Sequence, residues 1–171
     1  MRPLVKRIEE MAWQKEDEQG RPRRTYDLEG LEKLIASLLE ASSEGAAVIV
    51  EGRRDEQALR SLGLPGPVIM ASRTPALDLA EDAARRYRHI ILLTDWDSKG
   101  EEMCRMIDLH LRSLGCRPDA EIRSRLKKLV KKDIKDVESL SRYTERMRGL
   151  YGPQDRSDWA ATGKVRGPLT L

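Results

Sequence analysis

The chain has 171 residues, which suits one domain with a modest extension, and 36% of its residues are charged. Only 4% are aromatic and none is Phe, so the core must be built from Leu, Ile, Val, Ala and Met, and the surface should be dense in ion pairs. A net charge of +3 is too small to argue for nucleic-acid binding by itself. No apolar run approaches the roughly 18 residues of a membrane span, and the start of the chain lacks the apolar region of a signal peptide. We therefore expect a soluble, cytoplasmic protein without membrane contact.

Hydrophobic periodicity predicts that helices alternate with short strands. The first 43 residues are expected to form a helical extension, residues 44–140 an α/β domain, and residues 141–171 a helix with an irregular tail. Within the domain, strands are expected at 46–50, 67–70 and 89–94, with a weaker fourth at 120–122. Helices are expected at 55–62, 75–87, 100–114, beyond 123 and at 136–150. This alternation predicts a mainly parallel sheet flanked by helices. The N-terminal helices could cover one side of the sheet or form a contact in a homodimer or protein complex.

Acidic residues follow two of the expected strands. Glu51 comes directly after the first strand, and Asp95 and Asp97 follow the third. Because the carboxyl ends of parallel strands share one edge of a sheet, we expect these three side chains to converge there. Carboxylates in one site repel one another unless a cation neutralises them, and hard oxygen ligands suit Mg²⁺ or Mn²⁺. The sequence therefore predicts a Mg²⁺ site, in which Glu51 is either a ligand or a general acid or base.

Two glycines adjoin these carboxylates. Gly52 and Gly100 would let the backbone approach a phosphate closely. The helix expected to begin near Gly100 would also point its N-terminal amides into the same region. These features indicate phosphate chemistry.

The two motifs resemble those of the TOPRIM family, which is shared by topoisomerases, bacterial primases, 5S rRNA-maturing ribonucleases and small stand-alone proteins. An apolar strand ending in Glu-Gly is matched by Val48 to Gly52, with Asp55 downstream as in the ribonuclease branch. The second motif, Asp-x-Asp-x-x-Gly, is matched by Asp95, Asp97 and Gly100. The resemblance covers residues 46–140 and implies a four-stranded, mainly parallel Rossmann-like sheet with helical extensions at both ends.

The family also implies roles for these residues. The glutamate that matches Glu51 is usually assigned proton transfer and can touch metal, and the aspartates that match Asp95 and Asp97 are assigned metal binding. The chain lacks a topoisomerase tyrosine domain and the zinc-binding and helicase-docking segments of a replicative primase. It therefore looks like a small stand-alone TOPRIM protein, nearest to the ribonuclease branch.

Several basic residues could hold nucleic-acid phosphates. Arg53, Arg54 and Lys99 lie next to the two motifs and could clamp a phosphate, or they could be ordinary exposed charges. A run from 123 to 132 holds six basic residues and no acidic one. Its lysines could contact a phosphate backbone, or the run could be a solvated helix face; they are Lys127, Lys128, Lys131 and Lys132.

Three further aspartates and one tryptophan could each have one of two roles. Asp55 could support the metal ligands or cap the first turn of a helix. Asp133 or Asp136 could lie close to the metal, as an aspartate does in primase relatives, or cap the helix that follows. Trp96 could stack on a base or pack against the next helix, and we favour packing.

These observations predict Mg²⁺-dependent phosphodiester chemistry on RNA or DNA, most simply endonucleolytic cleavage of structured RNA. Glu51, Asp95 and Asp97 are the expected catalytic residues. One alternative is a non-catalytic nucleic-acid-binding protein of a replication, repair or RNA-processing complex. Another is a primase-like nucleotidyl transferase.

Overall fold

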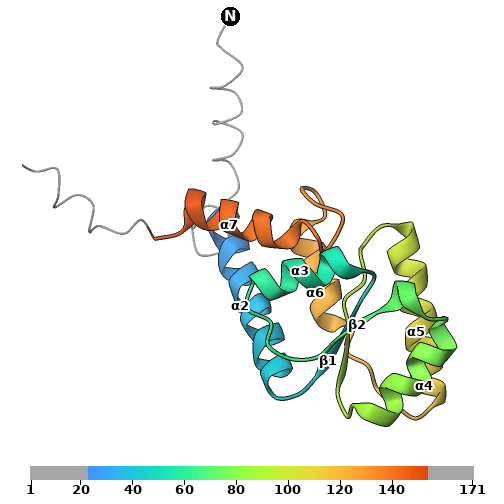
Figure 1. Cartoon of the computed structure of the whole chain (residues 1–171). Coiled ribbons are helices and arrows are strands. Elements are labelled where there is room, and N and C mark those ends of the chain that lie inside the picture. Colours follow the sequence, from blue (N-terminus) through green and yellow to red (C-terminus); the bar gives the residue numbers. More distant parts are fainter. Residues whose placement is uncertain (1–22, 154–171) are drawn as a thin grey trace, which may run out of the picture.

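A computed structural model describes residues 23–153 of the chain. The described part holds a parallel sheet of three strands in the order β2-β1-β3 (Figure 1). Strand β1 (Ala47–Val50) pairs with β2 (Val68–Met70) on one side and with β3 (Ile90–Leu92) on the other. The α/β class and the parallel sheet are therefore confirmed.

Six α-helices of the described residues surround this sheet. They are α2 (Arg23–Ser43), α3 (Arg53–Ser61), α4 (Ala76–Arg86), α5 (Ser98–Ser113), α6 (Glu121–Val130) and α7 (Leu140–Tyr151), with a short 3-10 helix, η1 (Ala71–Arg73), after β2. A helix or helical turn follows every strand, which is the βαβ alternation that the sequence predicts. The prediction of a helix at 136–150 places its start too early, because α7 begins only at Leu140.

The predicted fourth strand at 120–122 is wrong, because α6 begins there. One isolated parallel bridge joins Asp119 to Ile91, with Asp119 N donating to Ile90 O and Asp119 O accepting from Leu92 N, both at 2.8 Å. The Asp119 side chain then accepts the amide of Glu121 at 2.7 Å. This local hydrogen bond turns the chain into α6 after a single residue of sheet pairing, as aspartates do before helices.

The sheet separates two hydrophobic cores. Alternate residues of a strand face opposite sides, so Val48, Val50 and Ile91 pack with α2, α6 and α7, whereas Ile49 and Leu92 pack with α4 and α5. Figure 1 shows these helices on the two sides of the sheet. All four residues of β1 are buried, as expected of a central parallel strand with both faces covered.

Helix α2 covers one face of the sheet. Its apolar stripe at Leu31, Ile35 and Leu38 is buried in the same core as β1. A bidentate ion pair from Arg148 of α7 to Glu32 joins the outer sides of the two helices. Of the two roles considered for the N-terminal helices, the described part of this extension takes the covering role. Residues 1–22 of the predicted extension and 154–171 of the predicted tail lie outside the described residues.

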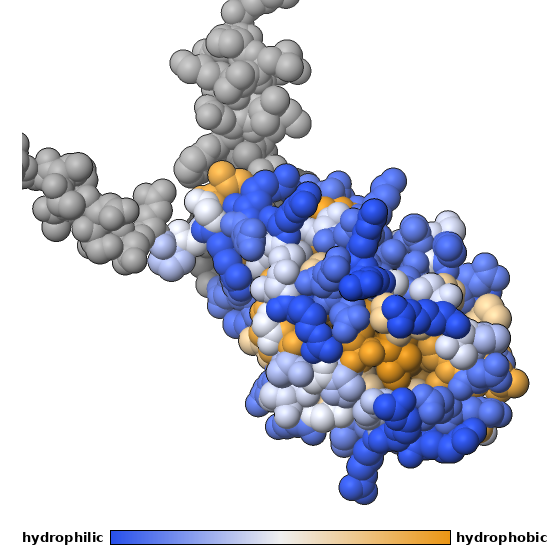
Figure 2. Space-filling view, viewed as in Figure 1, coloured by the Kyte–Doolittle hydropathy of each residue, from blue (hydrophilic) through white to orange (hydrophobic). Residues whose placement is uncertain are grey.

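The described surface is rich in ion pairs, as the composition predicts. Five pairs join residues four apart on one helix: Glu29–Lys33, Glu56–Arg60, Glu81–Arg85, Asp82–Arg86 and Asp108–Arg112. Figure 2 shows a mainly hydrophilic surface that surrounds one hydrophobic patch on the face in view. Each pair stabilises its helix by only about 0.3–0.5 kcal/mol, so most of the stability must come from the two cores. None of the described helices combines the length and the hydrophobicity needed to cross a membrane.

Candidate active site at the sheet edge

Glu51 lies at the carboxyl end of β1 with its side chain half-buried. Its Oε1 atom is buried and has no hydrogen-bond partner among the described residues. Burial, followed by the charges of Asp97 and Asp55, raises the pKa of Glu51, while a backbone hydrogen bond from Asp95 and the charge of Lys99 act in the opposite direction. A buried carboxylate oxygen without a donor is costly, so this atom is positioned for a proton or a cation.

Asp95 lies beyond β3, close enough to Glu51 for the two charges to interact. The Val137 amide donates to Asp95 Oδ1 at 2.8 Å, which ties the side chain to the segment before α7. Burial, together with the charges of Asp55, Glu51 and Asp136, raises the pKa of Asp95 to about 7. The structure thus places half-buried, mutually repelling carboxylates at one edge of the sheet, as the strand ends predict.

Asp97 is exposed and caps helix α5. Its Oδ1 accepts the amide of Gly100 at 2.7 Å. A Cβ atom at Gly100 would lie 2.0 Å from the backbone oxygen of Asp95 and 2.9 Å from Glu51 Oε1. Gly100 is therefore required because the start of α5 passes directly over the two carboxylate-bearing segments. At Gly52, by contrast, a Cβ would meet only Ser72 Oγ at 4.0 Å, so the N-terminus of α3 is open to an approaching group.

The three further aspartates divide between two locations. Asp55 is buried, accepts the Gly52 amide at 3.0 Å and has a raised pKa caused first by burial and then by nearby carboxylates. Asp136 is close enough to contribute to the raised pKa values of Asp55 and Asp95, and it also accepts the Ser139 amide at 2.8 Å. Both residues therefore combine the capping role and the position near the cluster. Asp133 instead accepts the hydroxyl of Tyr143 at 2.9 Å.

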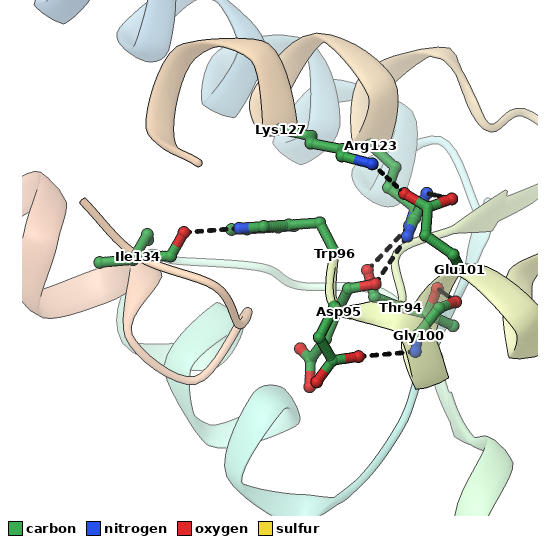
Figure 3. A network of polar contacts seen from close by, with 9 residues as sticks. Thr94, Asp95, Trp96, Gly100, Glu101, Arg123, Lys127 and Ile134 are labelled. Atoms are coloured by element: carbon green, nitrogen blue, oxygen red, sulfur yellow. Dashed lines mark hydrogen bonds and ion pairs between the residues drawn. The ribbon is translucent and has the colours of Figure 1, made fainter. Parts of the chain in front are cut away.

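Arg123 is a site residue that the sequence did not single out from the basic run. It is only 5% exposed, and its guanidinium donates to the backbone oxygens of Thr94 at 2.9 Å and Asp95 at 2.6 Å (Figure 3). Glu101 of α5 pairs with Arg123 at 3.3 Å and also with Lys127. Arg123 thus fixes the backbone that carries Asp95. The only sequence signal is its position beside Ile122 and Leu126 on the apolar stripe of α6.

The predicted phosphate ligands differ in availability. Arg53 and Lys99 are exposed beside the cluster, and Arg54 is exposed with a single 3.6 Å contact to Glu138. Lys127 is half-buried against Glu101 and is part of the Arg123 network. The remaining lysines of the run are exposed: Lys128, Lys131 and Lys132.

Trp96 packs into the protein, as we favoured from the sequence. It is 7% exposed, and its indole Nε1 donates to the backbone oxygen of Ile134 at 2.7 Å. The Trp96 amide also donates to Lys135 O at 3.2 Å. These contacts join the Asp95 segment to the 134–137 segment, and so they help to position the carboxylates of both.

The carboxylates of the described residues do not form a ready-made cage. No group of three His, Cys, Asp or Glu side chains within residues 23–153 is arranged so that it could hold a metal ion between them. The acidic cluster, defined as Glu51, Asp55, Asp95, Asp97 and Asp136, is instead a set of electrostatically coupled groups around the N-termini of α3 and α5.

The chain is similar to proteins of several archaea. A UPF0292 protein of Methanosarcina barkeri is 38% identical over 132 residues, which cover 77% of this chain and 92% of that protein. The chain belongs to the UPF0292 protein family. A UPF0292 protein of Thermococcus gammatolerans is 49% identical over 94 residues, covering 55% of this UPF0292 chain and 70% of the relative.

A solved structure of a protein from Aquifex aeolicus is similar to this UPF0292 chain in fold as well. The two are 30% identical with a TM-score of 0.56, over 64% of this chain and 96% of the Aquifex protein. No family model matches the chain. The names of these relatives state no activity, so the function has to be argued from the site.

Proposed function

We propose that this UPF0292 chain is a TOPRIM-type protein that carries out Mg²⁺-dependent phosphodiester chemistry on nucleic acid, with endonucleolytic cleavage as the reaction. The observation that carries the proposal is the unpartnered, buried Oε1 of Glu51 within a set of coupled carboxylates whose pKa values are raised. Burial and like charges both disfavour the ionised forms, so a cation in the cluster would relieve a cost that the fold maintains.

The donors of the acidic cluster fit Mg²⁺. All are carboxylate oxygens, which this ion prefers, and the ion usually takes only one or two protein carboxylates and completes its shell with water and substrate phosphate oxygens. A three-residue cage is therefore not required. Glu51 and Asp95 would hold the ion, with the exposed carboxylate of Asp97 beside them. When bound, Mg²⁺ supplies polarisation of a phosphoryl oxygen and stabilisation of the leaving oxygen.

Residues of the chain itself would supply proton transfer and orientation. Because its pKa is raised, the Glu51 carboxyl group titrates nearer to neutral pH than an ordinary glutamate, and a general acid or base works best when its pKa is near the working pH. Arg53 and Lys99 are exposed beside the cluster and would hold the charge of a phosphodiester. Arg123 would position Asp95 through its backbone oxygen without contacting the substrate.

A cleavage assay across labelled structured RNA, single-stranded RNA and DNA, each with Mg²⁺ or Mn²⁺, tests this proposal. Glu51→Gln and Asp95→Asn should each abolish cleavage and leave the melting temperature no lower than that of the parent. Asp82→Asn is the matched control and should cleave normally. Asp82 is exposed on α4, which packs on the face of the sheet opposite α2, α6 and α7. Full activity in both site variants would overturn the proposal. Binding to all substrates without turnover would favour a non-catalytic accessory role, and template-dependent nucleotide addition would favour a primase-like activity.

A further inference from the structure

A groove of about 470 Å³ lies between α3 and α7, next to the acidic cluster. Arg54, Gln57 and Ser61 line it from α3, and Ser139, Ser141 and Arg142 from the start of α7. Arg54 contacts Glu138, whose charge also contributes to the raised pKa of Asp55. Glu138 both lines the groove and lies close enough to Asp55 for their charges to interact, which places the groove beside the acidic cluster.

The N-terminus of α7 presents unpaired donors. The amide of Leu140 donates to Val137 O at 3.0 Å, whereas the amides of Ser141 and Arg142 have no hydrogen-bond acceptor among residues 23–153. The first turn of this twelve-residue helix contains no acidic residue, and its N-cap, Ser139, makes no side-chain capping bond. The Asp136 carboxylate accepts the Ser139 amide outside the groove lining, so the free amides of Ser141 and Arg142 are the donors that this helix end leaves for a group in the groove.

Ser141 provides independent support for a ligand. The residue is only 8% exposed, and its hydroxyl has no hydrogen-bond partner in the described part of the chain, although the residue lines the groove. By contrast, the hydroxyl of Thr144, which is fully buried in the same helix, donates to Leu140 O at 2.7 Å. The Ser141 hydroxyl is therefore available to a group that enters the groove.

The charges of the groove select the kind of anion. Arg142 is exposed and has no ion-pair partner among the described residues, and Arg54 holds Glu138 only at 3.6 Å. The lining also contains the acidic residues Glu138 and Glu145, which balance the two arginines. With two arginines and two glutamates the lining carries no net positive charge, which suits the single charge of a phosphodiester better than the several charges of a polyphosphate. The volume equals that of about fifteen waters, which leaves room for a nucleoside attached to the phosphate.

We propose that the groove between α3 and α7 binds an internal phosphodiester of the nucleic-acid strand beside the phosphate that reacts at the acidic cluster. The Ser141 and Arg142 amides, the Ser141 hydroxyl and the Arg142 guanidinium donate to the phosphate oxygens. This inference rests on the proposed function, because it extends the same site along the substrate. It assigns α7 a role in binding the nucleic-acid strand, separate from the reaction at the acidic cluster.

The test is fluorescence anisotropy with short fluorescein-labelled single-stranded RNA and its DNA counterpart, using the full chain in EDTA so that no turnover occurs. Arg142→Ala should weaken binding about tenfold, because a hydrogen bond to a charged group is lost, and should reduce the salt slope by about one. Ser141→Ala should weaken binding about threefold, with a melting temperature equal to or above that of the parent because the hydroxyl has no protein partner. Arg105→Ala, at an exposed position of α5 on the other side of the sheet, is the charge-matched control.

Equal binding losses in Arg142→Ala and Arg105→Ala would overturn the groove as a site. Oligonucleotides with a 5′-hydroxyl and a 5′-phosphate should bind equally, and a strong preference for the 5′-phosphate would overturn the internal phosphodiester in favour of a terminal phosphate. The experiments distinguish a failure of the groove proposal from a failure of the proposed function. Cleavage by the parent with unchanged binding of Arg142→Ala would contradict the groove alone, whereas groove-dependent binding without cleavage of any substrate would contradict the proposed function alone.

Discussion

Replacing Arg123 with alanine should destabilise the protein more than any other change in the basic run. The guanidinium donates to the backbone oxygens of Thr94 and Asp95 and is 5% exposed, so its removal leaves two carbonyl groups without their donor. Hydrogen bonds to charged groups contribute about 1.5–3 kcal/mol each, so the loss of two should cost about 3–6 kcal/mol. Glu101 keeps its contact with Lys127 and adds little to this cost.

Thermal unfolding followed by calorimetry measures the effect. For a chain of this size each kcal/mol lowers the melting temperature by about 2–4 °C, so Arg123→Ala should melt roughly 10 °C below the parent. Arg123→Lys, which keeps the charge but not the planar fork, should fall between the two. Arg125→Ala is the matched control on the same helix, where the side chain is exposed, and should lie within about 0.5 kcal/mol of the parent. If Arg123→Ala had the same melting temperature as Arg125→Ala, the anchoring role of Arg123 would be refuted.

Three further substitutions test the site with the same melting assay. Gly100→Ala should destabilise the protein by about 3 kcal/mol, because its Cβ would lie 2.0 Å from Asp95 O. Gly149→Ala in α7, where a Cβ meets nothing within 4 Å, should instead stabilise the protein by up to about 1 kcal/mol. Equal effects of the two substitutions would contradict the close packing at Gly100. Because the folded pKa of Asp95 is about 7 and lies above the unfolded value, the unfolded state binds fewer protons between about pH 4 and 7, and stability falls as the pH rises through this window. Asp95→Asn should therefore raise the melting temperature at pH 8 without divalent metal, through a gain of about 1–2 kcal/mol in the free energy of unfolding after solvent screening. The same variant should melt close to the parent at pH 4. A lower melting temperature at pH 8 would contradict the raised pKa of Asp95. Trp96→Phe should cost about 1 kcal/mol through the lost bond to Ile134 O, and an unchanged stability would show that this bond contributes nothing.

The strand-end carboxylates could be predicted from the sequence because their placement depends on local pattern and parallel topology. An apolar run followed by Glu51, and another followed by Asp95, must end at the same sheet edge once the strands are parallel. The same reasoning placed β1, β2 and β3 within a few residues. It failed at 120–122, where one side-chain hydrogen bond from Asp119 starts a helix after a single bridge.

What could not be predicted depends on which long side chains the fold buries. Arg123 and Lys128 belong to the same basic run, yet the first is buried against backbone oxygens of another segment and the second is exposed. Asp133 and Asp136 lie three positions apart, but Asp133 faces Tyr143, whose pKa burial raises to about 12, while Asp136 interacts with Asp95. These outcomes follow from contacts between separate segments of the chain, which periodicity alone does not align.

Binding of Mn²⁺, a paramagnetic substitute for Mg²⁺, tests most directly whether the acidic cluster is a cation site. Electron paramagnetic resonance of free Mn²⁺ should reveal a tight site in the parent that Mg²⁺ displaces. That site should be lost in Glu51→Gln and in Asp95→Asn and retained in Asp82→Asn. Mn²⁺ binding that is equal in the parent and both site variants would contradict the account, because the unpartnered Oε1 of Glu51 and the raised pKa of Asp95 would then have no connection with a cation.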